Sequence, residues 1–317
     1  MYTLFKIAAS LALKLYCKKT IARFHGNRGK KEPTLIASNH PNSFFDAIII
    51  AVHYPEPIYF LARGDAFKNP IVANFLRALH LIPIYRLSEG KQNLNKNEDT
   101  FKTCLDLLHE NKTILIFSEG ICINEWNLRP LKKGTARLAF MALQDGLLNL
   151  RIQPTNINYS SFHKNPKEVE INFNLCFGVH HIDQAKESIF YNTFNTLLKK
   201  NILNNMVVKE DLSDIKLLKP NPKWHSRLLK VVIAFPALIG FLSNYWIYWI
   251  LKKITGKKTK NSVFYDSILF GMLLLLYPLI VFLLSAVVTF CFNLLMGLLL
   301  FFVMPISAWF YKSYKSY

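Results

Sequence analysis

The chain has 317 residues, of which 51% are hydrophobic, and it carries 39 lysines and arginines against 20 aspartates and glutamates. The net charge of +19 suits nucleic acid, an anionic membrane surface or phosphorylated substrates. Since a soluble nucleic-acid-binding protein needs fewer apolar residues, the composition favours a membrane and argues against nucleic acid. The five cysteines form no Cys-x-x-Cys pair, so we expect reduced thiols facing a cytosol, without disulfides or a metal site.

The first predicted element is an amphipathic helix at the N-terminus. Apolar residues recur at helical spacing in residues 1–20, and lysines follow at positions 18 and 19. The uninterrupted apolar run is at the lower limit for the core of a signal peptide. We expect residues 1–25 to lie in the membrane interface with the apolar face in lipid. A helix packed on the following domain is the alternative.

Strand and helix patterns alternate within residues 26–220. Such alternation predicts an α/β fold with a mixed, largely parallel central sheet flanked by helices. Residues 168–177 alternate between polar and apolar, which predicts a further strand with one exposed face. The other strands are predicted at residues 34–37, 58–62, 81–85, 114–117 and 152–159, and the helices at 47–52, 66–80, 98–110 and 134–147.

Residues 221–317 have the composition of a membrane domain. The 44 residues from 268 to 311 contain no charge. As one helix they would extend about 66 Å, twice the thickness of a hydrocarbon core, so a transmembrane helical hairpin over about 264–311 fits better than a single span. The earlier apolar segment, about 231–251, is long enough to cross but contains Pro236 and Gly240.

Basic residues flank the segment 231–251 on both sides. If it crossed the membrane once, one of the two basic clusters would violate the positive-inside rule. A re-entrant or in-plane helix, broken near Pro236, would keep both clusters on the cytosolic side. The hairpin would return Lys312 and Lys315 to that side as well.

The stretch Ser-Asn-His-Pro-Asn-Ser-Phe-Phe-Asp lies between the predicted strand 34–37 and the predicted helix 47–52. A histidine at a strand end with an aspartate close behind can form a base and its orienting carboxylate, so His40 and Asp46 are the candidate catalytic pair. Proline is favoured at the first helical position, so we expect Pro41 to open the helix and leave His40 outside it. A turn must then bring His40 to Asp46.

Further polar residues follow other predicted strands. Glu119 and Gly120 come directly after the strand 114–117, at the end where ligands bind in open α/β sheets. Lys132 and Lys133 precede a helix, and ammonium groups beside a helix N-terminus form an anion site.

Two arginines also end predicted strands. Arg63 follows the strand 58–62, and Arg86 follows the strand 81–85. Each arginine alone is typical of a solvated surface. Because both come at the same end of successive strands, we expect them to converge with the other cations.

In order and spacing these blocks resemble the glycerolipid acyltransferase family, which acylates glycerol 3-phosphate or 1-acylglycerol 3-phosphate. The resemblance covers roughly residues 30–190. Within that family, this sequence is similar to a bacterial branch that has five residues between His and Asp and a hydrophobic C-terminal extension. The corresponding blocks are Asn39-His40 with Asp46, Arg86, Phe117-Ser118-Glu119-Gly120 with Lys133-Gly134, and Ile152-Gln153-Pro154.

This sequence departs from the family pattern at two points. The family usually has four residues between His and Asp. After Glu-Gly it usually continues Thr-Arg, where this chain has Ile121-Cys122. That arginine would ordinarily help to hold a phosphate, so anion binding falls on the remaining cations: Arg63, Arg86, Lys132 and Lys133.

The resemblance implies acyl transfer from acyl-CoA or acyl carrier protein to a hydroxyl of glycerol 3-phosphate or lysophosphatidate, in phospholipid biosynthesis. His40 would be the general base, and Asp46 would fix its tautomer. Asn39, Glu119 and Gly120 would help to bind substrate. No cofactor beyond the thioester co-substrate is implied. We expect a bacterial inner membrane, with the catalytic domain facing the cytoplasm and membrane lipids as partners.

Two other functions stay open. One is an O-acyltransferase for a different lyso-lipid, such as an amino-acid lipid, which the missing arginine favours. The other is a non-catalytic membrane scaffold with a degenerate acyltransferase domain. Because His40, Asp46 and Glu119 are all present, the sequence argues against the scaffold.

Overall fold

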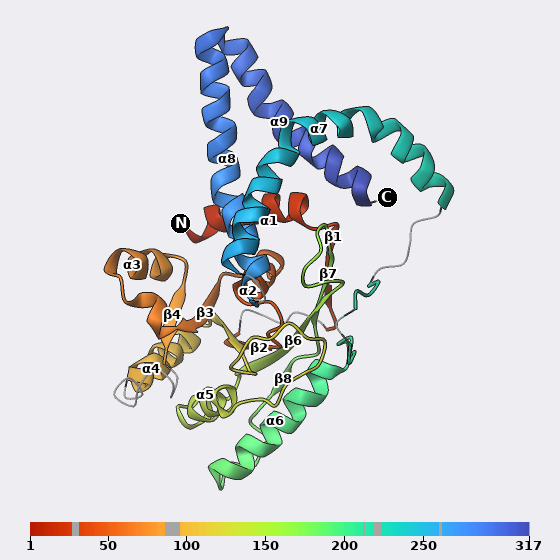
Figure 1. Ribbon diagram of the computed structural model, residues 1–317. Coiled ribbons are helices and arrows are strands. Elements are labelled where there is room, and N and C mark those ends of the chain that lie inside the picture. Colours follow the sequence, from red (N-terminus) through yellow and green to blue (C-terminus); the bar gives the residue numbers. More distant parts are fainter. Residues whose placement is uncertain (27–31, 86–95, 212, 218–222, 260–261, 317) are drawn as a thin grey trace.

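The computed structural model describes residues 1–26, 32–85, 96–211, 213–217, 223–259 and 262–316. An α/β part holds the sheet, and long apolar helices extend from one side of it (Figure 1). The sheet is mixed and largely parallel, with helices on both faces, so the predicted fold class is confirmed.

Within the described residues, eight strands form one sheet in the order β1-β7-β6-β2-β5-β3-β4, and β8 pairs with β6. β6, β2, β5, β3 and β4 are parallel, whereas β7 runs antiparallel to β6 and parallel to β1. The bounds are β1 (Lys19–Phe24), β2 (Thr34–Ser38), β3 (Ile58–Arg63), β4 (Leu81–Ile84), β5 (Thr113–Phe117), β6 (Arg151–Tyr159), β7 (Glu168–Phe173) and β8 (Phe177–Gly178).

Successive residues of a strand face opposite sides of the sheet, and β2 shows how this builds two cores. Leu35 and Ala37 pack beneath α4 (Lys96–His109), α5 (Lys133–Gln144) and α6 (Glu187–Leu203). Ile36 packs on the other face with residues of α1 (Tyr2–Tyr16) and α2 (Phe44–His53). A short 3-10 helix, η1 (Gly64–Phe67), and α3 (Pro70–Ala78) connect β3 to β4.

The N-terminal helix is shorter than expected. The prediction of a helix over residues 1–25 is wrong beyond Tyr16, because residues 19–24 form β1 and pair in parallel with β7. Side chains across this pair favour the strand: Arg23 bonds to Glu170, and Phe24 stacks on Phe173. The expected exposed face of residues 168–173 is also wrong, because the polar residues Glu168 and Asn172 of β7 are buried too. Asn172 donates to the carbonyl of Asn205, and Glu168 accepts the backbone N–H of Leu217, so the segment after α6 covers this face.

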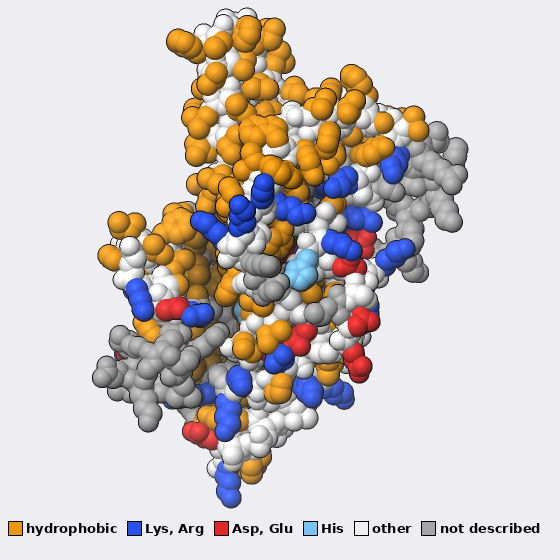
Figure 2. Space-filling model, in the orientation of Figure 1, with side chains coloured by type: hydrophobic (Ala, Val, Ile, Leu, Met, Phe, Trp, Pro, Cys, Tyr) orange, Lys and Arg blue, Asp and Glu red, His pale blue; other side chains and the backbone are white. Residues whose placement is uncertain are grey.

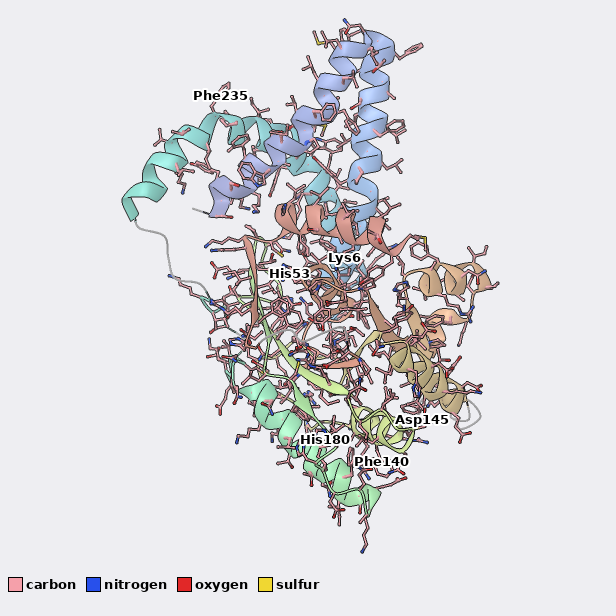
Figure 3. All side chains as sticks on the ribbon, turned by 180° about the vertical axis from the view of Figure 1, so that it is seen from behind. Lys6, His53, Phe140, Asp145, His180 and Phe235 are labelled. Atoms are coloured by element: carbon pink, nitrogen blue, oxygen red, sulfur yellow. The ribbon has the colours of Figure 1, made fainter. Side chains whose placement is uncertain are left out.

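Helix α1 lies between the sheet and the apolar helices (Figure 3). Ala9 and Leu13 are buried against the rest of the protein. Leu4 and Ile7 are exposed on another face, at 73% and 54%. The helix therefore packs on the domain and still presents an apolar row outward, and its place in a membrane interface stays a prediction.

The C-terminal part consists of α7 (Lys223–Lys258), α8 (Tyr265–Cys291) and α9 (Leu294–Ser316). α8 and α9 form the expected hairpin (Figure 1). α7 runs through Pro236 without a break, and it curves strongly, with Phe235 on the outer side of the bend (Figure 3). The expected break near Pro236 is therefore wrong: a proline removes one backbone hydrogen bond, and here the helix bends instead of ending.

The surface of these helices is apolar (Figure 2). Phe290, near the tip of the hairpin, is 93% exposed, an arrangement that is unfavourable in water and natural in lipid. Among the residues that the structure describes, three helical segments are long and apolar enough to cross a membrane: Leu229–Lys258, Tyr265–Cys291 and Leu294–Ser316. Basic side chains gather where this apolar part meets the α/β part (Figure 2), as expected at a membrane surface.

Candidate active site

The turn after β2 carries the candidate base. β2 ends at Ser38, and α2 begins at Phe44 with Ser43 as its N-cap residue. The expectation that Pro41 opens the helix is therefore wrong. The chain first passes through Ser43, whose φ of 54° few non-glycine residues adopt, and this bend sets where the helix can begin.

His40 and Asp46 are in contact. The distance between His40 Nδ1 and Asp46 Oδ2 is 2.9 Å, because the turn carries the imidazole back to the first turn of α2. The imidazole stacks on Phe117 at the end of β5, with ring centroids 3.8 Å apart, and 16% of the His40 side chain is exposed. Since a carboxylate accepts, Nδ1 carries the proton and Nε2 keeps a lone pair.

The carboxylate of Asp46 is fully buried and hydrogen-bonded on both oxygens. Tyr159 donates its hydroxyl to Oδ1 at 2.7 Å, and the backbone N–H of Asn42 donates to Oδ2 at 2.8 Å. Burial raises the pKa of Asp46, and the bonds from His40, Tyr159 and Asn42 oppose that rise. Burial and the neighbouring Asp46 raise the pKa of Tyr159 well above its ordinary value, so its hydroxyl stays a donor.

Glu119 lies beside His40 at the end of β5. Its Oε1 accepts the backbone N–H of His40 at 2.8 Å, and Oε2 accepts the backbone N–H of Arg129 at 3.4 Å. Burial raises the pKa of Glu119 to about 7. Gly120 has a φ of 66°, and a Cβ there would lie 2.9 Å from Cγ of Lys132, so this turn requires glycine.

Asn39 does not face the site as expected. Its Oδ1 accepts the backbone N–H of Ile157 at 2.9 Å, and its Nδ2 donates to the Ile157 carbonyl at 3.2 Å. The residue is 1% exposed. Both the oxygen and the nitrogen of the Asn39 amide bond to the backbone of β6, so the prediction that this side chain contacts substrate is wrong. Asn39 instead links the end of β2 to β6.

Three of the four predicted cations lie at the carboxyl edge of the parallel strands. Arg63 ends β3, is half exposed and pairs with Asp65. Lys132 and Lys133 are exposed at the start of α5. Among the described residues, none of the three bonds to His40. Arg86 lies outside the residues that the structure describes.

The segment between β5 and α5 covers the turn that carries His40. The Sγ of Cys122 accepts the backbone N–H of Ser43 at 2.8 Å. Asn124 donates its amide to the carbonyl of Pro41 at 2.7 Å. Cys122 and Asn124 therefore support the turn that carries His40.

Several contributors come from segments far away in the sequence. Tyr159 had no local signal. Asp266 and Ser267, from the first turn of α8, also reach the turn, through the side chain and carbonyl of Asn42. Asp266 did carry a signal, since it is the one acidic residue after position 228, and a carboxylate in an apolar segment marks a candidate functional residue.

These contacts define a histidine–carboxylate site at the carboxyl edge of an α/β sheet. Nε2 of the oriented imidazole can accept a proton from a hydroxyl group, which then becomes a nucleophile. In the part of the chain that the structure describes, no group of three or more His, Cys, Asp or Glu side chains gathers as a metal site. The contact between His40 and Asp46 gives the site the chemistry of enzymes that activate a hydroxyl group with a base.

Part of the chain is similar to known proteins. Residues 21–158 match the family model described as Acyltransferase. A 1-acyl-sn-glycerol-3-phosphate acyltransferase of Bacillus subtilis is 30% identical over 108 residues, which make up 34% of this chain and 49% of that enzyme. A chloroplastic enzyme of the same name from Brassica napus is 24% identical over 134 residues, 42% of this chain and 37% of the relative.

The match over residues 21–158 and the names of these relatives support the glycerolipid acyltransferase family for this region of the chain. The chain spans less than half the length of these curated relatives, and the matched family region ends before α6 to α9. A solved structure, the 1-acyl-sn-glycerophosphate acyltransferase of Thermotoga maritima, has a TM-score of 0.47 and 16% identity, covering 66% of this chain and 81% of that one.

The buried position of Glu119 predicts a pH-dependent stability. An unfolded chain ionises this carboxyl near its ordinary pKa of 4.5, whereas the folded protein ionises it near 7. Between about pH 4.5 and pH 7 the folded protein therefore keeps a proton on Glu119 that the unfolded chain has lost. The contribution of Glu119 to the free energy of unfolding falls as the pH rises through this range. We expect Glu119→Gln, which cannot ionise, to gain melting temperature over the wild type between pH 5 and pH 8.

Differential scanning fluorimetry of the purified protein in detergent measures this difference. Because all other titrating groups are common to both proteins, the difference isolates residue 119. A melting-temperature difference that stays constant from pH 5 to pH 8 would contradict the raised pKa.

Proposed function

We propose that the protein transfers a fatty acyl group from an acyl thioester to the free hydroxyl of lysophosphatidate, at a membrane surface. Glycerol 3-phosphate is the corresponding acceptor without an acyl chain. The family match and the names of the curated relatives support acyl transfer to this class of acceptor. The donor is acyl-CoA or acyl carrier protein, and no cofactor is involved.

The observation that carries the proposal is the contact between His40 Nδ1 and the buried Asp46 at 2.9 Å. A carboxylate at Nδ1 fixes the neutral tautomer that has its lone pair on Nε2, and it stabilises the imidazolium when Nε2 takes a proton. Bonds from Tyr159 and Asn42 hold the carboxylate in place. The pair is therefore preorganised as a general base.

The proposed reaction runs in two proton transfers. Nε2 of His40 takes the proton of the acceptor hydroxyl as its oxygen attacks the thioester carbonyl. The tetrahedral intermediate then collapses, the carbon–sulfur bond breaks, and the thiolate takes the proton from the imidazolium. The products are the new ester and the free thiol, and His40 returns to its starting state.

The acceptor's phosphate requires cations near the base. Lys132 and Lys133 stand at the N-terminus of α5, where backbone N–H groups add positive potential. Arg63 ends the strand beyond β5 at the same edge. We assign the phosphate to these three residues together with Arg86, while Glu119 and Gly120 shape the turn against which the acceptor binds.

The membrane location is part of the proposal. The three long apolar helices support attachment to a lipid bilayer, and lysophosphatidate is itself a lipid. The basic side chains at the base of these helices favour the cytoplasmic side of a bacterial inner membrane (Figure 2). An in-plane rather than crossing α7 would keep both ends of that helix on this side.

His40→Ala should abolish acyl transfer, with turnover at least about 100-fold below wild type, because the general base is lost. The measurement is transfer of a radiolabelled acyl group from acyl-CoA, and in parallel from acyl carrier protein, to lysophosphatidate by the purified protein in detergent. His109→Ala is the matched control, since His109 forms an exposed pair with Asp145 at 2.6 Å, and it should keep full turnover.

The same assay with glycerol 3-phosphate and with lyso-aminolipids identifies the acceptor. Preference for a lyso-aminolipid would favour the alternative function, an O-acyltransferase for an amino-acid lipid, which the sequence Ile121-Cys122 leaves open. Turnover of His40→Ala near that of wild type would refute the proposed mechanism, and absence of transfer to every acceptor would favour a scaffold.

A further inference from the structure

Two consecutive residues at the start of α8 contact the turn between His40 and α2. Asp266 and Ser267 are 1% and 0% exposed. Asn42 donates its amide to Asp266 Oδ2 at 2.7 Å. The hydroxyl of Ser267 donates to the carbonyl of Asn42 at 3.1 Å and accepts the backbone N–H of Phe45 at 3.0 Å. The hairpin thus makes two hydrogen bonds to the turn and one to the first turn of α2.

Asn42 connects the two buried carboxylates. Its backbone N–H donates to Asp46 and its side chain donates to Asp266. The next residue, Ser43, has a positive φ, and a non-glycine residue in that conformation persists only when its surroundings fix it. The contacts from α8 supply part of that fixation.

Asp266 is anchored independently of the turn. It also bonds to the buried Lys167, in the loop before β7, and to the hydroxyl of Tyr16 at the end of α1. A buried carboxylate needs such partners, because an unpaired charge in an apolar interior is strongly destabilising. Asp266 therefore holds Asn42 against a fixed frame made of α1, the sheet and α8.

We propose that Asp266 and Ser267 are positioning residues of the catalytic centre, so that the membrane hairpin completes the turn that aligns Asp46 with His40. The proposal rests on the proposed acyl transfer. The residues act through Asn42 and touch neither substrate. Both lie outside residues 21–158, the region that matches the acyltransferase family.

The least disruptive test is Ser267→Ala, which removes one hydroxyl and its hydrogen bonds to Asn42 in the turn and to Phe45 in α2. We expect kcat to fall at least tenfold, with the KM for both substrates within about twofold and the melting temperature close to wild type. Ser285→Ala is the matched control: Ser285 is also buried on α8, and within the described residues its hydroxyl has no hydrogen-bond partner. Its kcat should equal that of wild type.

A second variant tests the carboxylate. Asp266→Leu combined with Lys167→Met replaces the buried ion pair by apolar side chains, which leaves no unpaired charge in the fold. We expect a protein that melts as wild type does but keeps the low kcat of Ser267→Ala. Wild-type kcat in both variants would overturn the proposal, as would a fall in kcat that only parallels a lost melting temperature.

These outcomes distinguish a failure of the proposed function from a failure of the role proposed for the hairpin. An active His40→Ala protein refutes the proposed function itself. An inactive His40→Ala protein with a fully active Ser267→Ala protein refutes only the role of the hairpin.

An apolar cavity lies between α1, α7, α8 and α9. Its volume is about 390 Å³, within the range of roughly 300–1,000 Å³ of ligand sites. Val281 and Phe301 line it toward the hairpin tip, whereas Asn165, Lys312 and Lys315 line it toward the α/β part. The cavity is thus apolar along its length and basic at one end.

We infer that this cavity holds one hydrocarbon chain of a lipid whose anionic headgroup meets Lys312 and Lys315. Three of its four walls are candidate membrane spans, so in a bilayer hydrocarbon chains are its nearest neighbours. A basic end at the membrane surface attracts anionic headgroups. The ligand chemistry, one chain and one phosphate, fits both the acceptor lysophosphatidate and a bilayer phospholipid.

Ala308→Trp fills the cavity from α9 and should reduce lipid binding at least tenfold. Native mass spectrometry of the full chain with added lysophosphatidate or phosphatidylglycerol measures this. Leu283→Trp, at an exposed position on α8, is the control and should bind as wild type does. Preference for lysophosphatidate would identify a second binding site for the acceptor, apart from the cations assigned to its phosphate in catalysis, and equal binding would identify a structural lipid site. Undiminished binding by Ala308→Trp would overturn the inference.

Discussion

Two buried carboxylates joined by one asparagine determine the geometry of the site. Asp46 is 0% exposed and Asp266 is 1% exposed. A buried carboxylate is stable only when hydrogen bonds replace its lost hydration. Asn42 supplies one bond to each of them. Satisfying both charges at once fixes the path of the chain from β2 into α2, and that path sets the position of His40.

The fold brings the remaining groups to the same place by simple topology. β2, β5 and β3 are adjacent and parallel, so the residues after each strand meet at one edge of the sheet. This edge carries His40 after β2, Glu119 after β5 and Arg63 as the last residue of β3. β6 adds Tyr159, and the apolar helices rest on the face that carries α1 and α2 (Figure 1). The candidate active site therefore lies beside the predicted membrane surface.

The alternating strands and helices, the hairpin and the adjacency of His40 to Asp46 follow from local periodicity and spacing, so the sequence predicted them. β1 was missed because its short strand continues directly from a helix and becomes a strand only by pairing with β7. The partners of the turn were missed for the same reason: Tyr159 lies 113 residues from Asp46, and Asp266 lies 224 residues from Asn42. Contacts across such distances leave no local pattern.

If Asp46 orients His40 as the base, the loss of the Asp46 carboxylate must slow acyl transfer. The rate of a single acyl transfer by Asp46→Asn measures this. The amide keeps the shape of the carboxylate but cannot stabilise an imidazolium or hold the same tautomer. We expect transfer to lysophosphatidate at least about 100-fold slower than in wild type, in a protein whose melting temperature shows that it is folded. Transfer at the wild-type rate by this variant would contradict this role of Asp46.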